Sequence, residues 1–176
     1  MADDSAPRLA LPGHLLRPLR ADDALAWASF AVLPAVKKHT SSSVNSVADL
    51  LPMIERAASG AADAPLHFAL CNAADQRLVG VVGFHTVSAV NRSAEITYIL
   101  HPDVWGQGLA TACARAAVAW GFEVRQWVRI QGTVLEPNVA SQQVLLKAGF
   151  VYEGLLHNFR IVRGEPRDYL LYAVTP

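Results

Sequence analysis

The chain is most constrained by one stretch, residues 94–123, in which the patterns of a strand, a glycine turn and a helix follow one another. Residues 96–100 are β-branched and aromatic, and Pro102, which has no backbone N–H, cannot continue their ladder. An Ala-rich run follows Gly106 and Gly108. The unpaired N–H groups at the start of such a helix converge on one point, and the helix dipole attracts anions to it. The stretch therefore predicts an anion-binding turn.

Two common phosphate-binding motifs do not fit this turn. A Walker loop needs Gly-x-x-x-x-Gly-Lys followed by Ser or Thr, and a dinucleotide fingerprint needs a third glycine where Thr111 stands. The run Gly106-x-Gly108-x-Ala110-Thr111 instead resembles the acyl-CoA pyrophosphate loop of the GNAT acetyltransferase superfamily, Gln/Arg-x-x-Gly-x-Gly/Ala. Gly108 and Ala110 fill its last two positions. Trp105 stands where Gln or Arg is usual, a departure that we associate with the RimJ/RimL-like branch.

A second segment strengthens the resemblance. Residues 128–135 have a strand pattern and should pair in parallel with the first strand through a right-handed crossover. In the following segment, residues 138–150, Asn138 is placed to cap a short helix and Gly149 to end it. This segment resembles the family's Asn-x-x-Ser/Ala helix that finishes in Gly-Phe. The two motifs occur in order, about 30 residues apart, and the resemblance extends from Leu15 to the end of the chain.

Hydrophobic patterning and breakers predict the remaining elements. Strands are expected at residues 15–19, 66–71, 78–87, 151–159 and 167–173, and helices at residues 24–30 and 49–58. The resemblance implies a GNAT fold of the α/β (α+β) class. Its central sheet is mixed and mostly antiparallel, is flanked by helices, and contains a parallel, splayed strand pair that opens a CoA cleft. We expect a flexible N-terminal tail over residues 1–13 and a single acyltransferase domain over residues 14–176.

Composition excludes several classes of protein. Fifteen basic residues balance fifteen acidic ones, so no net field draws the chain to nucleic acid or to an anionic membrane. No apolar run reaches the roughly 18 residues that span a bilayer, and the first residues lack the basic region of a signal peptide. Cys71 and Cys113 are too few for a disulfide framework or a zinc site, so no metal is expected. The chain is expected to be cytoplasmic, and its neutral surface fits a monomer or a homodimer.

The resemblance implies where acyl-CoA lies. Its pantetheine arm enters the wedge between the splayed strands, against the backbone of Ile99, Leu100 and His101. Its pyrophosphate rests on the N–H groups of the turn, which belong to Gln107, Gly108, Leu109, Ala110 and Thr111. Asn138 is expected to reach a pantetheine amide, to cap its own helix, or both. Ser141 lies beside the thioester, and Lys147 lies either near the 3′-phosphate or in solvent.

Direct attack of an amine on the thioester needs a neutral amine, a stabilised oxyanion and a proton for the leaving thiolate. Many relatives supply that proton from a Tyr seven residues after the Asn, where this chain has Leu145. Ser141, an alternative acid of the RimL-like branch, is expected to replace it. Glu95 is the expected base, acting directly or through water, unless it is a strand carboxylate that pairs with an arginine. The titratable alternatives to Glu95 are His85, His101 and His157.

The acceptor amine is less constrained. An α-amine with a pKa of ~8 is about a tenth neutral at pH 7, whereas a lysine at ~10.4 is neutral only about once in a few thousand molecules. A weak base therefore favours an N-terminal α-amine or a small amine. Its pocket is expected to contain Trp27, Phe30, Tyr98, Glu153 and His157. Arg160 and Arg163 would suit a carboxylate-bearing acceptor or donor, unless they stay solvated.

Three functions fit the sequence. The leading hypothesis is an N-acetyltransferase that uses acetyl-CoA and acts on a protein N-terminus or a small amine. A second enzyme would use another donor, such as succinyl-CoA. The third is a non-catalytic CoA-binding or sensing module, and the departures at Trp105 and Leu145 give it weight.

Overall fold

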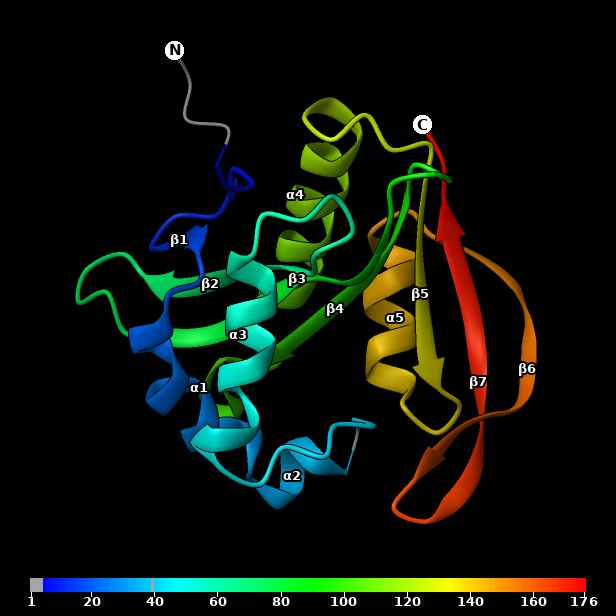
Figure 1. Ribbon diagram of the computed structural model, residues 1–176, viewed down its shortest axis with the longest axis horizontal. Coiled ribbons are helices and arrows are strands. Elements are labelled where there is room, and N and C mark those ends of the chain that lie inside the picture. The colour runs from blue at the N-terminus through cyan, green and yellow to red at the C-terminus, as the bar shows by residue number, and fades with distance from the viewer. Residues whose placement is uncertain (1–4, 39) are drawn as a thin grey trace.

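One seven-stranded sheet organises the chain, and the computed structural model describes residues 5–38 and 40–176 (Figure 1). The strand order is β1-β2-β3-β4-β5-β7-β6. All neighbouring strands pair antiparallel except β4 and β5, which are parallel. The predicted mixed, mostly antiparallel sheet is therefore confirmed. The strands are β1 (His14–Pro18), β2 (Leu66–Asn72), β3 (Leu78–Ser88), β4 (Ser93–Leu100), β5 (Arg129–Leu135), β6 (Val151–Val162) and β7 (Glu165–Val174).

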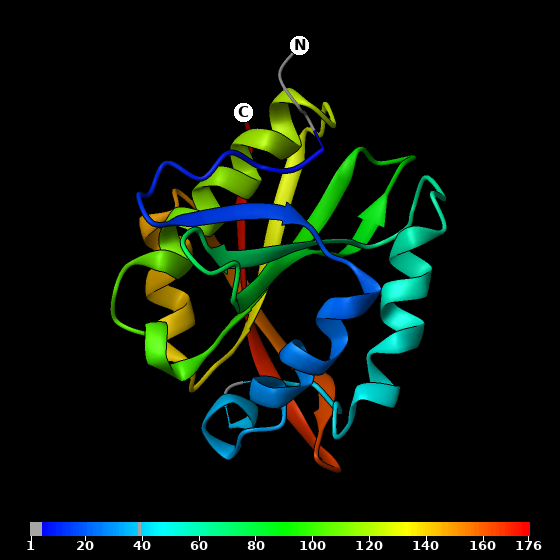
Figure 2. The ribbon, with the colours of Figure 1, turned by 90° about the vertical axis from the view of Figure 1, so that its left-hand side faces the viewer.

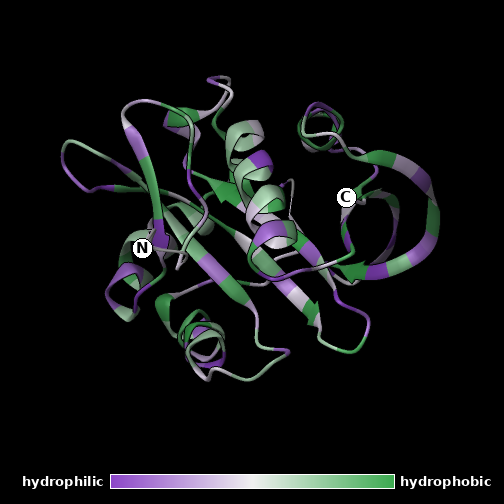
Figure 3. Cartoon of the chain, turned by 90° about the horizontal axis from the view of Figure 1, so that it is seen from above, coloured by the Kyte–Doolittle hydropathy of each residue, from purple (hydrophilic) through white to green (hydrophobic). Residues whose placement is uncertain are grey.

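Helices cover the sheet, and the sheet separates two hydrophobic cores (Figures 1 and 2). The helices are α1 (Ala24–Ala31), α2 (Pro34–Lys37), α3 (Leu51–Ala58), α4 (Leu109–Glu123) and α5 (Val139–Lys147). The larger core joins the sheet to α4 and α5, and the smaller one joins it to α1 and α3. Strands and helices alike mix hydrophobic and hydrophilic residues, as expected of elements that bury one face (Figure 3). Within the described ranges, no helix has both the length and the apolar character of a membrane span.

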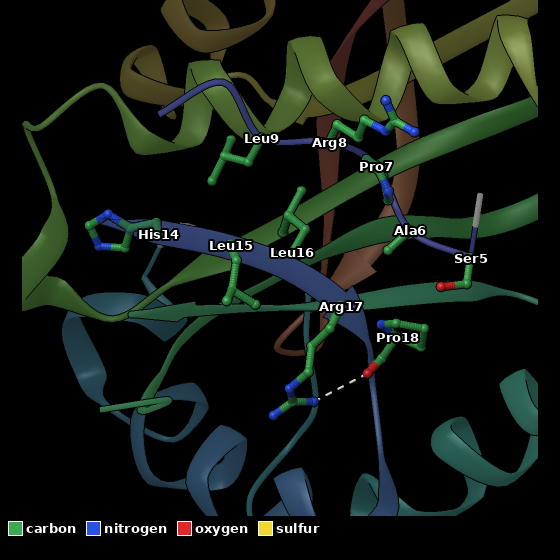
Figure 4. Close-up of a pocket in the computed structure, with 10 residues that line it drawn as sticks. All are labelled: Ser5, Ala6, Pro7, Arg8, Leu9, His14, Leu15, Leu16, Arg17 and Pro18. Carbon is green, nitrogen blue, oxygen red and sulfur yellow. Dashed lines mark hydrogen bonds between the residues drawn. The ribbon is translucent and has the colours of Figure 1, made fainter. Parts of the chain in front are cut away.

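The N-terminal segment is described from Ser5 onward, and residues 1–4 of the expected tail lie outside the described residues. Residues 5–13 form no helix and, before β1, no strand. Ala6, Leu9 and Leu11 nevertheless pack against the larger core. Together with β1 this segment encloses a cavity of about 330 Å³ (Figure 4). The boundary between tail and domain at residue 13 stays a prediction.

The parallel strands β4 and β5 pair over three positions only. Residues 93–95 of β4 lie opposite residues 129–131 of β5. Beyond Glu95, β4 continues to Leu100 with β3 as its partner, while β5 continues to Leu135 with β7 as its partner. The two strands therefore diverge from Glu95 onward (Figure 1). This divergence is the predicted splayed pair, and we call it the splay.

Strands β2 and β3 approach each other unusually closely at Gly83, which lies opposite His67. A Cβ atom at Gly83 would lie 1.9 Å from the carbonyl oxygen of Leu66 and 2.9 Å from the Cα of His67. Both obstructing atoms belong to the backbone, so they cannot swing aside as a flexible side chain would. Only glycine fits between these two strands.

Replacing this glycine tests the packing of the sheet. Gly83→Ala should lower the free energy of unfolding by about 3 kcal/mol, because the added methyl group forces β2 and β3 apart. Urea unfolding followed by circular dichroism measures the change. Gly154→Ala in β6 is the matched control, because a Cβ there meets no atom within 4 Å. Equal midpoints for the two variants would contradict the packing described here.

Candidate functional site

The glycine turn leaves the start of α4 open. Gly106 and Gly108 have φ angles of 75° and 77°, in the left-handed region that favours glycine. Gly108 is the N-cap residue of α4, and no side chain caps this helix in the described chain. The N–H of Ala112 donates to the carbonyl of Gly108 at 3.0 Å, which is the first hydrogen bond of the helix. The N–H groups of residues 109–111 lie before it and have no acceptor within the helix. The helix therefore presents its positive end as an anion site.

The backbone of β4 explains which groups face the splay. The N–H of His101 donates to the carbonyl of Val79 in β3 at 2.8 Å. The backbone N–H and C=O groups of a strand point to alternate edges from one residue to the next. Ile99 lies two residues before His101, so its backbone groups point toward β3 as well. The groups of Tyr98 and Leu100 point to the other edge, where β5 has diverged. This unpaired stretch of β4, residues 96–100, is called the open edge.

The expected backbone contacts with pantetheine are corrected at two positions. His101 has both its main-chain groups engaged, because its carbonyl accepts the N–H of Val104 at 3.1 Å. Ile99 is directed toward β3 by the alternation of the strand. Only Leu100 faces the splay as expected. Its carbonyl accepts the indole N–H of Trp105 at 2.9 Å. Trp105, which stands where the family usually has Gln or Arg, thus connects the turn to the end of β4.

Helix α5 carries Ser141 toward β4. The side-chain oxygen of Asn138 accepts the N–H of Ser141 at 3.1 Å, so the predicted N-cap is confirmed. The Ser141 Oγ lies 2.7 Å from the hydroxyl of Tyr98, which also donates to the Ser141 carbonyl at 3.3 Å. Burial raises the pKa of Tyr98 to about 12, which keeps its hydroxyl protonated at neutral pH. The sequence placed Tyr98 in the acceptor pocket and did not predict this hydroxyl pair.

Glu95 marks the point where β4 and β5 diverge, and its side chain is buried, with 6% of the residue exposed. Its Oε1 accepts the hydroxyl of Thr133 at 2.6 Å and a guanidinium N–H of Arg160 at 2.9 Å. Its Oε2 accepts the amide of Gln131 at 3.3 Å. The imidazole Nε2 of His85 lies 3.3 Å from Oε1. Four side chains from three other strands thus surround one carboxylate, which we call the Glu95 cluster.

These partners decide the acid–base character of Glu95. Burial alone would raise the pKa of this carboxyl, but the adjacent His85 imidazole, the hydrogen bond from Thr133 and the positive charge of Arg160 outweigh it and lower the pKa to about 2. Transfer of a proton from an ammonium of pKa ~8 to such a carboxylate is unfavourable by about 8 kcal/mol. Glu95 is therefore poorly suited to act as a direct base, and its expected role as a base, directly or through water, stays a prediction. The arginine-paired alternative is what the structure contains.

Two expected acceptor residues belong to the smaller core instead. Trp27 is 5% exposed and packs against His67 with ring centroids 5.8 Å apart. Phe30 is fully buried and packs edge-on against His101, with ring centroids 5.7 Å apart. Their expected place in an acceptor pocket is wrong, because the hydrophobic face of α1 packs against the sheet. The sequence could not distinguish an aromatic core from an aromatic pocket.

The other expected residues lie on the surface with partners of their own. Glu153 forms a bidentate ion pair with Arg129, at 2.9 and 2.5 Å. The Nδ1 of His157 lies 2.9 Å from a carboxylate oxygen of Asp168. Lys147 is exposed at the end of α5, and its carbonyl accepts N–H groups of Arg115. Contacts of Glu153 and His157 with an acceptor, and of Lys147 with a phosphate, stay predictions.

Two cavities in the described residues lie away from the splay. One is the N-terminal cavity beside β1 (Figure 4). The other, of about 320 Å³, is lined by Ala62, Ala89, Arg92, Val124, Arg125 and Trp127. Neither contains a residue of the glycine turn, the open edge or the Glu95 cluster. The chemistry of this chain is therefore assigned from hydrogen-bonding groups, not from the size of a cavity.

Comparison with known proteins gives consistent matches. A family profile described as the acetyltransferase (GNAT) domain matches residues 14–151. The spermidine N(1)-acetyltransferase of Escherichia coli is 33% identical over 101 residues, which cover 57% of this chain and 54% of that protein. The ribosomal-protein-serine acetyltransferase of Escherichia coli is 33% identical over 102 residues, which cover 56% of this chain and 55% of that protein. The chain thus spans just over half the length of these curated relatives.

A solved structure extends the similarity over nearly the whole chain. Mycobacterium smegmatis RimJ, in complex with CoA-disulfide, is 30% identical and superposes with a TM-score of 0.81. The superposition covers 92% of this chain and 81% of that chain. Its identity agrees with the predicted RimJ/RimL-like branch.

The state of Glu95 can be measured through stability. Its pKa of about 2 in the folded chain lies below the usual value near 4.5, so its ionised form stabilises the fold above pH 4.5. That contribution, about 3 kcal/mol, is lost as the pH falls from 4.5 toward 2. The difference in unfolding free energy between the native chain and Glu95→Gln should shrink by this amount over that range.

Urea unfolding at a series of pH values measures this difference. Glu136→Gln gives the baseline for loss of one carboxylate, because Glu136 is exposed and forms no ion pair within the described residues. A difference for Glu95→Gln that does not change with pH would contradict the electrostatic account of the Glu95 cluster.

Proposed function

The chain belongs to the GNAT acetyltransferase family, and we propose that it transfers an acetyl group from acetyl-CoA to a primary amine. One observation carries the proposal. Strand β4 links the glycine turn, the Ser141–Tyr98 hydroxyl pair on the open edge, and Glu95, which is the last residue before that edge. A donor that lies along this edge would have its anionic end at the turn and its reactive end near the hydroxyl pair.

The turn and the open edge suit the two halves of the donor. The diphosphate is proposed to accept hydrogen bonds from the N–H groups of residues 107–111, at the positive end of α4. The pantetheine amides are proposed to bond the open edge through the main-chain groups of Tyr98 and the carbonyl of Leu100, as an added strand would. Asn138 already caps α5 with its side-chain oxygen, and a further contact with pantetheine stays part of the proposal.

The proposed reaction is direct attack by the amine nitrogen on the thioester carbon. A C–N bond forms, and the carbonyl oxygen becomes an oxyanion for which the N–H of Leu100, on the open edge, is the proposed donor. The C–S bond then breaks, and the leaving thiolate takes a proton from Ser141. The hydroxyl of Tyr98, 2.7 Å away, supports Ser141 by returning the proton, which it recovers from solvent.

Glu95 acts in this scheme as a fixed negative charge. Because its pKa is about 2, it stays ionised throughout the reaction. It stabilises the positive charge that forms on the attacking nitrogen, and the amine proton leaves through water. An acceptor whose amine is partly neutral in solution, such as an α-amine with a pKa of ~8, fits this weak assistance better than a lysine side chain. The named acceptors of the relatives, spermidine and a ribosomal-protein serine, do not by themselves select one acceptor.

Thiol release tests the function. The chain, acetyl-CoA and a panel of N-terminal peptides, amino acids and polyamines should release free CoA with at least one acceptor. Isothermal titration should give saturable CoA binding in parallel. Succinyl-CoA in the same assay tests the alternative donor. Binding without turnover on any acceptor would contradict the enzyme and support a CoA-binding module, and absence of binding would overturn both.

Removal of either hydroxyl tests the proton route. Ser141→Ala and Tyr98→Phe should each lower kcat about 10- to 100-fold, and the double variant should lose little more, because the two groups act as one unit. Affinity for CoA should stay within about twofold. Ser29→Ala, on α1, is the matched control. Full turnover in both single variants would assign the proton to another group.

A further inference from the structure

We propose that the acceptor of this enzyme carries a carboxylate close to its amine, and that the guanidinium of Arg160 binds that carboxylate. The inference rests on the proposed acetyl transfer and narrows its substrate class. It excludes polyamines and simple alkylamines as preferred acceptors. It stands on the position of Arg160, on its unused hydrogen-bond donors, and on the charge balance of the Glu95 cluster.

Arg160 is held in a fixed orientation. Its Nη2 donates to Oε1 of Glu95 at 2.9 Å and lies 3.4 Å from the hydroxyl of Thr133. The guanidinium carbon lies 5.1 Å from the ring centroid of Phe159 and 5.6 Å from that of Tyr169, and the two rings contact each other edge to face. An arginine that packs against aromatic rings and is anchored at one nitrogen loses little further entropy when it binds a ligand. Arg160 is therefore preorganised.

The remaining donors of Arg160 are available. A guanidinium has five N–H groups, and no group within the described residues accepts from Nε or Nη1 of Arg160. The side chain is 33% exposed, whereas that of Glu95 is 7% exposed. The Arg160 side chain is thus partly accessible to solvent, whereas the carboxylate that it binds is buried. A planar edge with parallel N–H groups matches the two oxygens of a carboxylate.

A bulge in β6 contributes to the placement of Arg160. The register of β6 against β7 shifts between Leu156 and Arg160, and Asn158 has a φ angle of 50°. The carboxylate of Asp168 holds this bulge, since it accepts the N–H of Asn158 at 2.8 Å and lies 2.9 Å from the ring of His157. Bulges commonly redirect a side chain. His157 thus helps to hold the bulge that positions Arg160.

The charge balance of the site disfavours a second ammonium group. The negative charge of Glu95 is already matched by Arg160, and His85 adds a further group that becomes positive when protonated. The nearby carboxylates of Glu153 and Asp168 are bound by Arg129 and by His157. A polyamine would therefore meet no unpaired carboxylate in this cluster. A carboxylated amine instead brings a group that the unused N–H groups of Arg160 can bind.

The geometry also limits the length of the acceptor. Arg160 and Glu95 are in direct contact, and Glu95 marks the start of the splay. An amine that reaches the splay next to Glu95 can carry a carboxylate to Arg160 only if few bonds separate the two groups. Two sources provide this chemistry: a free amino acid with its own α-carboxylate, and a peptide whose first residue is Asp or Glu.

Matched acceptor pairs test the proposal with the native chain and acetyl-CoA. The pairs are free amino acids against their amides and peptides that begin with Asp against peptides that begin with Asn, with spermidine as a further acceptor. At least one carboxylated member should exceed its neutral partner at least tenfold in kcat/KM. Faster turnover of amino acids than of their amides would identify a free amino acid as the acceptor. Faster turnover of peptides that begin with Asp than of those that begin with Asn would identify an acidic N-terminus. Equal or better turnover of the neutral members or of spermidine overturns the proposal.

Variants of Arg160 then assign the preference to this residue. In Arg160→Gln, the ratio of kcat/KM for the carboxylated acceptor to kcat/KM for its neutral partner should fall close to one, mainly because KM for the carboxylated acceptor rises. Arg160→Lys should keep only part of this ratio, because lysine lacks the planar guanidinium that binds both carboxylate oxygens. Arg167→Gln is the matched control, since Arg167 lies opposite Arg160 on β7 and is exposed. An unchanged ratio in Arg160→Gln overturns the assignment.

Acetyl transfer and the role of Arg160 are tested by different outcomes. If the chain binds CoA and acetylates no amine at all, the proposed function fails. If it acetylates neutral amines as well as carboxylated ones, only the inference about Arg160 fails. The acceptor panel uses the native chain, so the result does not depend on whether a variant of Arg160 folds.

Discussion

The structure depends on the point at which β4 loses its second neighbour. Up to Glu95 the strand is paired on both sides, and beyond it only β3 remains as a partner. An unpaired strand edge inside a sheet leaves main-chain donors and acceptors that need partners. One is satisfied internally, because Trp105 bonds the carbonyl of Leu100. The others suit an extended ligand with amides of its own, and this requirement joins the fold to its function.

The Glu95 cluster holds the two diverging strands in place. A buried carboxylate is costly unless its oxygens are paired, and here they accept from Gln131 and Thr133 on β5 and from Arg160 on β6. All three partners lie on other strands than Glu95, so their hydrogen bonds connect β4 to β5 and β6. The same bonds that fix the strands also keep the carboxylate ionised. A structural requirement thus gives the site a permanent negative charge beside an oriented guanidinium.

Much of the fold was predictable from local patterns, and the turn most of all. Glycines at 106 and 108, Asn138 before α5 and the strand patterns on either side of α4 each depend on short-range chemistry. The partners of Glu95 and the Tyr98–Ser141 pair depend on which strand positions lie opposite one another, and the sequence does not state that register. For the same reason Trp27 and Phe30 were assigned to a pocket although they fill a core. Had the register been known, with Glu95 opposite Gln131, Thr133 could have been predicted as a partner of Glu95, because it lies two residues further along the same face of β5.

A crystal structure of the chain with acetyl-CoA tests the central claim most directly. The account predicts that the diphosphate accepts hydrogen bonds from the N–H groups of residues 107–111. It also predicts that the pantetheine arm lies along the open edge of β4, with the thioester sulfur next to the hydroxyl of Ser141. A diphosphate bound elsewhere, or an arm that leaves the edge of β4 unpaired, would contradict it.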